Sequence, residues 1–553
     1  MFKKIIYLLF ISWYLLPANT TFAYTHADTL RGSNGRGRSW WDARHYDLTV
    51  KFDTAARSIT GYNRIAFKIT AMPADSMQLD LQEPMVLDSV VMMPYNSALQ
   101  PQKMTIAHEG NVWWIKYPFS KMLQDSTYSL TAYYHGIPRQ AVHPPWDGGF
   151  SWAKDKNGKL WIAVSCQGLG ASVWWPCKDA QWDEPEQGAR VTLSVPASLK
   201  AVSNGRLLSE SPQGSDYTSY TWQTKNPINN YDITFYIGDY VHWHEDYNGE
   251  KGMLDLDYWV LRENEERAHK QFEVVKQMIH CFEYWMGPYP FYEDGYKLVD
   301  APYLGMEHQG AIAYGNNYQK GYLGYDRSMT GFGSSWDYII VHESGHEWFG
   351  NNVTARDMAD NWIHEGITSY SEALFTECSM GSSGRDKGNR YSRGLWHSIR
   401  NESPVIGNYG VNEEASGDIY EKGAAVMHMI REMTGNDERF RNMLRGLGKE
   451  FYHQTVTTQQ VEDYISSHTG LELKAFFNQY LRTAAIPQLE YYIKNNELNF
   501  RFNNTVPGFA IPVRATAGDF SRPLKPTAEW QHIPWAAGYN VDFSKDFLMK
   551  IKK

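Results

Sequence analysis

The stretch at 338–352, Y-I-I-V-H-E-S-G-H-E-W-F-G-N-N, places two histidines four residues apart within an apolar run. On an α-helix, His342 and His346 then project from the same side, one turn apart, so both rings can reach one metal ion. Glu343 lies between them and slightly further round the helix, where its carboxylate can reach a metal-bound water without binding the metal. The pattern His-Glu-x-x-His therefore predicts a helix that carries a zinc site.

Two histidines alone also fit a solvated helix face with no metal, so a third ligand decides between these interpretations. Glu365 follows His346 after eighteen intervening residues, in the sequence W-I-H-E-G. The Gly-Asn-Asn sequence at 350–352 favours a helix end, and a second helix over roughly 358–378 can run back past the first. Glu365 then joins His342 and His346, and three protein ligands with an open fourth position are typical of a catalytic zinc. We expect one zinc ion per chain, in the arrangement of a metalloprotease.

The chain has 553 residues, more than one hydrophobic core usually supports, so two to four domains are expected. Hydrophobic residues make up 42% and charged residues 21%, which is typical of a folded, soluble protein. The net charge of -9 and the lack of a basic run argue against a nucleic-acid partner. Beyond the N-terminus no apolar stretch is long enough for stable membrane insertion. The oligomeric state stays open.

Residues 1–23 have the three parts of a secretory signal peptide. Two lysines precede an apolar run over 5–16, and small residues follow before Ala23. The pattern predicts cleavage after Ala23 and export of the mature chain, to a periplasm or to the exterior.

Four cysteines are spread along the chain, and we expect them to be buried thiols. Cys166 and Cys177 are the two close enough in sequence to suggest a disulfide in an oxidising compartment, so that pairing is kept as an alternative. The other two are Cys281 and Cys378.

The periodicity of apolar residues divides the chain into parts. Residues 24–45 form a leader, and its Gly-, Ser- and Arg-rich segment 31–38 is expected to be mobile. Short runs with alternating apolar residues over 46–245 predict an antiparallel β domain. Helical spacing dominates 246–486, and 487–553 predicts a small β-sandwich that opens with a hairpin across Asn495 and Asn496.

Two further motifs accompany the zinc pattern. Gly305-Met306-Glu307 lies upstream of His342, and Tyr420-x-Lys-Gly-Ala lies downstream. With the zinc residues, these motifs resemble the aminopeptidase N and leukotriene hydrolase family of zinc metallopeptidases, over about 46–487. The resemblance implies a saddle-like N-terminal β domain, a thermolysin-like α/β catalytic domain that is mainly helical, and a small C-terminal β-sandwich.

The resemblance also implies roles for residues around the zinc. Glu307, with Gly305 and Met306 beside it, would bind the free α-ammonium group of a peptide, and Gln167 would supply a second contact to that amine. Tyr420 would donate its hydroxyl hydrogen to the oxyanion that forms during hydrolysis. The sequence departs from the family pattern next to Glu307, where His308 replaces Asn and Leu304 replaces Gly. Backbone contacts to the substrate are therefore expected to differ there.

Glu372 follows Glu365 by seven residues and lies on the same helical face. It can accept the second ring hydrogen of a zinc-binding histidine, and the alternative is a solvated acid. His364 points away from Glu365 round the helix and is not expected to bind the metal.

These residues predict a zinc-dependent aminopeptidase in which Glu343 is the general base and peptides with a free N-terminal amine are the substrates. Three alternatives remain: a leukotriene hydrolase-like epoxide hydrolase, a non-catalytic peptide-binding member, and a zinc endopeptidase. The endopeptidase would cleave blocked peptides internally, whereas the proposed role of Glu307 requires a free amine.

Overall fold

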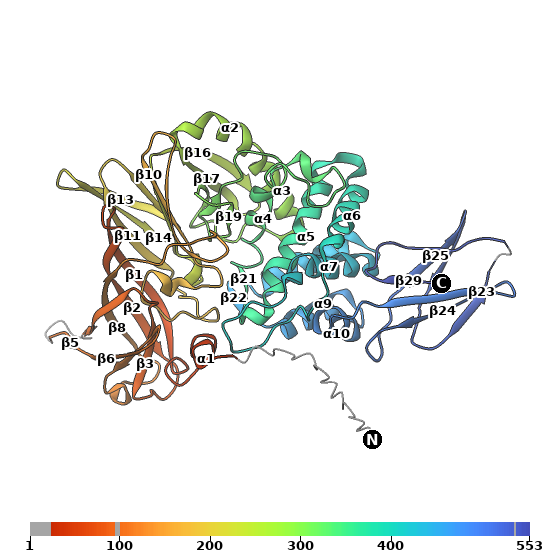
Figure 1. Cartoon of the computed structure of the whole chain (residues 1–553), viewed down its shortest axis with the longest axis horizontal. Helices are drawn as coiled ribbons and strands as arrows, with labels where there is room; N and C mark the ends of the chain where they lie inside the picture. The colour runs from red at the N-terminus through yellow and green to blue at the C-terminus, as the bar shows by residue number, and fades with distance from the viewer. Residues whose placement is uncertain (1–23, 94–99, 536–537) are drawn as a thin grey trace, which may run out of the picture.

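The fold comes from a computed structural model that describes residues 24–93, 100–535 and 538–553. The predicted signal peptide, 1–23, lies outside these residues. A β domain, a mainly helical domain and a small β-sandwich follow one another along the long axis (Figure 1). Within the described ranges, none of the helices combines the length and apolar character needed to cross a bilayer.

The N-terminal domain is built on an eight-stranded sheet. The strands run in the order β13-β14-β11-β1-β2-β8-β4-β5. Their bounds are β1 (Trp41–Asp53), β2 (Ser58–Ile69), β4 (Val86–Met93), β5 (Gln102–Lys103), β8 (Thr127–Gly136), β11 (Ala189–Pro196), β13 (Arg206–Gln213) and β14 (Tyr217–Gln223). Two smaller sheets complete the domain, one made of β9 (Gly149–Lys154), β10 (Leu160–Ser165), β12 (Lys200–Ser203) and β15 (Phe235–Gly238), the other of β3 (Ser76–Asp80), β6 (Thr105–Glu109) and β7 (Val112–Lys116).

Buried and outward-facing side chains alternate along β1, and the buried ones form part of the core of this domain. Tyr46, Leu48, Val50 and Phe52 are fully buried, while the residues between them face outward, as the period of two predicts. β1 pairs with β2 in antiparallel register but with β11 in parallel register. The prediction of a β domain is confirmed, and this parallel pair is the departure from the expected antiparallel arrangement.

The expectation of a mobile segment at 31–38 is wrong. Residues His26–Gly32 form a helix, α1, which begins with a capping box between Thr25 and Asp28. Arg38 is fully buried and forms an ion pair with Asp80. A buried charge is held in place by its partner, so the polar composition of this segment reflects specific pairing rather than mobility.

The central domain contains a five-stranded sheet in the order β16-β17-β18-β20-β19. β19 therefore lies at one edge. The predicted boundary between 245 and 246 falls inside β16, because this strand pairs with β17 along its whole length. The bounds are β16 (Tyr240–Gly249), β17 (Gly252–Leu261), β18 (Tyr296–Asp300), β19 (Gly305–Met306) and β20 (Ile312–Tyr314).

Helices make up the rest of the central domain. α3 ends at Met286, directly before Gly287, which has a φ of 97°, and α9 begins with a capping box between Thr457 and Gln460. The bounds are α2 (Glu265–Phe272), α3 (Val274–Met286), α4 (Tyr338–Gly345), α5 (Trp362–Ser379), α6 (Gly384–Leu395), α7 (Glu421–Thr434), α8 (Asp437–Glu450), α9 (Thr458–Thr469) and α10 (Lys474–Arg482). A short parallel pair, β21 (Val353–Ala355) with β22 (Gln454–Val456), joins two of the loops.

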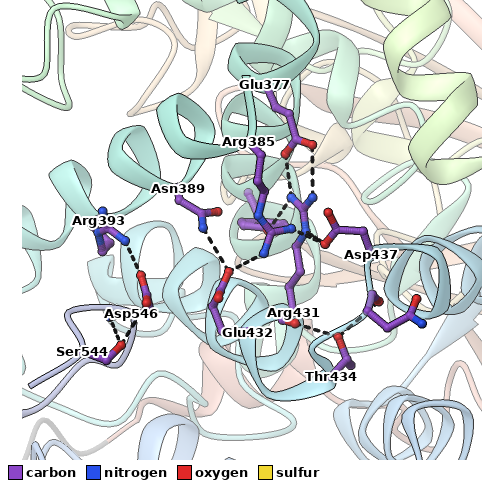
Figure 2. A network of polar contacts seen from close by, with 12 residues as sticks. Glu377, Arg385, Asn389, Arg393, Arg431, Glu432, Thr434, Asp437, Ser544 and Asp546 are labelled. Atoms are coloured by element: carbon purple, nitrogen blue, oxygen red, sulfur yellow. Dashed lines mark hydrogen bonds and ion pairs between the residues drawn. The ribbon is translucent and has the colours of Figure 1, made fainter. Parts of the chain in front are cut away.

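Two cross-links hold α5 in place. A disulfide joins Cys281 on α3 to Cys378 on α5, whereas Cys166 and Cys177 are buried free thiols. The expectation of buried thiols is therefore confirmed for Cys166 and Cys177, and the alternative pairing of these two is wrong. The expectation is wrong for Cys281 and Cys378, because the packing of α3 against α5 brings together these cysteines, which are 97 residues apart. Figure 2 shows the second cross-link, in which Arg431 of α7 donates to Glu377 of α5 at 2.8 Å.

The C-terminal region is a sandwich of a four-stranded and a three-stranded sheet, as predicted. Its hairpin turns at Asn495 and Asn496, both with positive φ, which is the geometry of a two-residue hairpin turn. Asp546 pairs with Arg393 of α6 and fixes the sandwich to the central domain (Figure 2). The strands are β23 (Gln488–Lys494), β24 (Glu497–Asn503), β25 (Val513–Ala517), β26 (Phe520–Leu524), β27 (Gln531–Pro534), β28 (Asp542–Phe543) and β29 (Lys550–Lys552).

Candidate active site

α4 carries the first part of the metal site. The side chain of Asp337 accepts hydrogen bonds from the backbone N–H groups of Ile339 and Ile340 and so fixes the start of the helix. The helix ends at Gly345, earlier than predicted, but His346 keeps helical backbone angles. It therefore stays on the same side as His342, and the two Nε2 atoms lie 3.3 Å apart.

α5 brings the predicted third ligand to this pair. Oε2 of Glu365 lies 3.5 Å from Nε2 of His342 and 3.3 Å from Nε2 of His346. All three side chains are buried, and this oxygen accepts no hydrogen bond from the described residues. Two imidazole nitrogens and a carboxylate oxygen that converge in a buried site match the donor set of zinc. The residues fit the metal that the sequence predicts.

The opposite nitrogen of each ring is also engaged. Nδ1 of His342 lies 2.8 Å from Oε1 of Glu372, and the hydroxyl of Tyr391 donates to the other oxygen of Glu372 at 2.7 Å. Nδ1 of His346 lies 3.1 Å from the carbonyl oxygen of Phe349. These acceptors favour the tautomer that leaves each Nε2 free for a metal. The structure thus places Glu372 where the sequence predicts it.

Glu343 lies one residue after His342 and faces the edge strand β19. Burial raises the pKa of Glu343 to about 7, so its carboxyl can both accept and release a proton near neutral pH. A Cβ atom on Gly305 would lie 2.6 Å from Oε1 of Glu343. A side chain at position 305 would therefore displace the carboxylate of Glu343.

Glu307 and Gln167 come from different domains and meet beside the metal site. The amide nitrogen of Gln167 donates to Glu307 at 2.7 Å and to Glu365 at 3.0 Å. Tyr231 also donates to Glu307, at 3.1 Å. Burial raises the pKa of Glu307. Tyr231 was not among the predicted site residues, because no recognisable motif surrounds it.

A cavity of about 820 Å³ is lined by the three predicted metal ligands together with Glu343, Glu307 and Gln167. Tyr420, at the N-terminus of α7, stacks on the ring of His342 with 6.2 Å between the ring centres. Glu414 and Arg327 also line the cavity, and neither was predicted because both come from loops without a recognisable motif. Burial, with Glu365 and Glu307 nearby, raises the pKa of Glu414 to about 7.

Two histidines close to the motifs do not join the metal set. Nε2 of His364 accepts a hydrogen bond from the backbone N–H of Ala355 at 2.7 Å, so this ring points away from the site as expected. His308 pairs with the hydroxyl of Tyr236 in the N-terminal domain, at 2.7 Å. It therefore packs between the two domains.

Residues 42–231 match the Peptidase M1 N-terminal domain, and residues 270–480 match the Peptidase family M1 domain. Aminopeptidase M1 of Arabidopsis thaliana is 24% identical over 87% of the chain and 55% of its own length. Leukotriene A-4 hydrolase of Xenopus laevis is 23% identical over 59% of the chain and 54% of its own length. The chain spans about half the length of the curated relatives that it matches.

Solved structures agree with the fold. The M1 zinc metallopeptidase from Deinococcus radiodurans superposes with a TM-score of 0.65 at 19% identity, over 81% of this chain and 96% of that chain. A mutant of that protein bound to the peptide Tyr-Ser-Ala superposes with a TM-score of 0.64 over 81% of this chain and 95% of that one. Two family domains in the expected order, together covering most of the chain, show that it belongs to peptidase family M1.

Proposed function

We propose that the chain is a zinc aminopeptidase that removes the N-terminal residue from peptides. The observation that carries this proposal is the position of Glu307 and Gln167, which lie together in one cavity with the three metal-binding residues. A buried carboxylate next to a hydrolytic metal site favours a substrate whose ammonium group lies close to the bond that is cleaved.

One group of residues binds the metal, and another binds the amine of the substrate. His342, His346 and Glu365 would hold the zinc ion, which would supply a Lewis acid and lower the pKa of water. Glu307 binds the substrate ammonium group through a charge-assisted hydrogen bond, and the side-chain amide of Gln167 supports it. The amine is thereby fixed, and the first peptide carbonyl is the group presented for attack.

Glu343 and Tyr420 act on the reacting atoms. Glu343 takes the proton from the attacking water and transfers it to the leaving amine, a role that suits a carboxyl group with a pKa near 7. Tyr420 donates its hydroxyl hydrogen to the carbonyl oxygen as negative charge develops there. β19 is an edge strand that lines the cavity, so the backbone of Gly305 and Met306 can pair with the substrate.

Kinetics on short peptides test this proposal. Glu343→Gln should lower kcat at least about 100-fold at unchanged zinc content, because general-base catalysis contributes 10²–10⁴-fold. Glu307→Ala should lower kcat/KM for peptides with a free amine. Equal cleavage of N-acetylated and free peptides by the unmodified protein would refute the aminopeptidase assignment, and turnover of a lipid epoxide alone would favour the epoxide hydrolase.

We also propose that the chain is exported. The pattern of residues 1–23 motivates this proposal, and the disulfide between Cys281 and Cys378 supports it, because such bonds persist mainly in oxidising compartments. Protein isolated from its native compartment, denatured without reductant, should show two titratable thiols, Cys166 and Cys177. Four thiols would argue for a reducing compartment.

A further inference from the structure

Arg327 is a cation in the wall of the catalytic cavity that the proposed mechanism does not use. Its guanidinium group donates one hydrogen bond to the hydroxyl of Tyr338 and one to the carboxylate of Glu421. The side chain is 27% exposed, and it lines the cavity together with Tyr338. Arg327 is therefore anchored on one side and open to the cavity on the other.

Arg327 keeps hydrogen-bond donors that are free to bind a ligand. A guanidinium group has five N–H donors in a rigid plane, and among the described residues only Tyr338 and Glu421 accept hydrogen bonds from Arg327. The group also packs over the ring of Tyr338, 5.1 Å from its centre, which fixes its plane. An arginine held in this way is preorganised to bind a planar anion through two parallel hydrogen bonds.

Arg327 and Glu307 have different neighbours at the metal site. Glu307 accepts a hydrogen bond from Gln167, which also donates to Glu365. Tyr338, the partner of Arg327, has its hydroxyl 3.3 Å from Nδ1 of His342 and stacks on that ring. A substrate with its amine on Glu307 and its first carbonyl at the metal continues toward the side of His342.

We propose that Arg327 binds a carboxylate of the substrate on the leaving-group side of the cleaved bond. This inference rests on the proposed aminopeptidase function. Two sources share the chemistry: the C-terminal carboxylate of a short peptide and the side chain of an acidic residue after the cleaved bond. The cavity then has an acidic end for the amine and a basic group for the carboxylate, and it suits short peptides that carry both charges.

Paired substrates test the inference on the unmodified protein. The first pair is a dipeptide that ends in alanine and its C-terminal amide. The second pair is two dipeptide amides that end in glutamate or in glutamine. In at least one pair, the carboxylate form should be cleaved with a kcat/KM about 10- to 100-fold higher, as expected for a charge-assisted contact. The pair that shows the preference identifies the source.

Variants assign the preference to a residue. Arg327→Gln should abolish it, and Arg327→Lys should keep only part of it, because lysine lacks the planar fork. Arg139→Gln is the matched control, since Arg139 lines the same cavity but pairs with Asp147, and the preference should persist in that variant. If the Arg327 variants do not fold, equal kcat/KM within both pairs in the unmodified protein would still overturn the inference.

Two results would overturn the inference alone. One is equal kcat/KM within both pairs in the unmodified protein. The other is an equal loss for carboxylate and amide substrates in Arg327→Gln, which would mean that Arg327 only holds Tyr338 and Glu421 in place. A protein that cleaves no peptide with a free amine would instead refute the proposed function, and the inference with it.

Discussion

Glu372 shows how a single buried carboxylate can control a metal site that it does not touch. Its Oε1 lies 2.8 Å from Nδ1 of His342. The charge of Glu372 orients this ring and makes the ring more basic. Glu372→Gln removes that charge, so zinc affinity should fall about 10- to 100-fold. Competition with a chelator measures this loss. Glu377→Gln on the same helix is the control, because Glu377 pairs with Arg431 instead, and it should lower the melting temperature but not the zinc affinity.

His428 makes stability depend on pH. It is fully buried on α7, neither ring nitrogen has a hydrogen-bond partner among the described residues, and burial lowers its pKa to about 3. The unfolded chain, with an ordinary histidine pKa, binds the proton more readily. The stability contribution of this residue is therefore complete above pH 6.5 and decreases as the pH falls toward 3, by roughly 2 kcal/mol at pH 5.

His428→Leu should reduce this dependence. Melting temperatures measured at pH 7 and pH 5 should differ less in the variant than in the unmodified protein. His468→Leu serves as the control, because His468 is exposed on α9 and its replacement should leave the pH dependence unchanged. If the difference between the melting temperatures at pH 7 and pH 5 is the same in His428→Leu as in the unmodified protein, the assignment of this effect to His428 is wrong.

At the site, sequence reasoning located the residues that carry a motif. His342, His346 and Glu365 converge as predicted, because helical spacing fixes the first two and the following helix has few ways to pack. Tyr231 and Arg327 could not be predicted. Arg327 reaches the cavity from a loop, and Tyr231 contacts Glu307 from a short 3-10 helix. The positions of such segments depend on tertiary contacts that leave no periodic pattern.

At the scale of helices, the contact between α5 and α7 links Glu365 to Tyr420. A Cβ atom on Gly366 would lie 2.7 Å from Cα of Gly423 and 2.9 Å from the carbonyl oxygen of Ile419. Gly366→Ala should separate the helices, shift Tyr420 relative to Glu365 and lower kcat. It should also cost about 1–3 kcal/mol of stability, as overpacking does.

Activity and thermal melting measured together check this prediction. Gly417→Ala is the matched control, because Gly417 lies just before Tyr420 and a Cβ atom there would meet no atom within 4 Å. It should leave both properties nearly unchanged. If Gly366→Ala is as active and as stable as the unmodified protein, the close helix contact does not set the position of Tyr420.

The elements themselves were largely predictable. The hairpin across Asn495 and Asn496 is present as predicted, because residues within the turn itself specify a two-residue turn. The short α4 and the strand β16 were misjudged at their ends. Both ends are set by partners elsewhere in the chain, and β16 continues through the predicted boundary because β17 pairs with it.

At the scale of the whole molecule, the site depends on how the two large domains dock. Gln181 of the N-terminal domain donates to the carbonyl oxygen of Ala355 and to the side chain of Asn361, which precedes α5, both at 2.8 Å. Gln181→Ala should weaken this docking by about 1–3 kcal/mol and lower kcat/KM at normal zinc content. Gln213→Ala on the exposed strand β13 should change neither melting nor kinetics.

Segment 24–38 connects the same domains from the outside. Arg31 pairs with Asp179 at 3.4 Å, and the carbonyl oxygen of Asp28 accepts a hydrogen bond from the backbone N–H of Asn412. The loop that follows Asn412 carries Glu414 into the cavity. A purification tag fused directly before Tyr24 would thus sit close to the loop that carries Glu414, so a tag attached after Lys553 is the safer design for kinetic work.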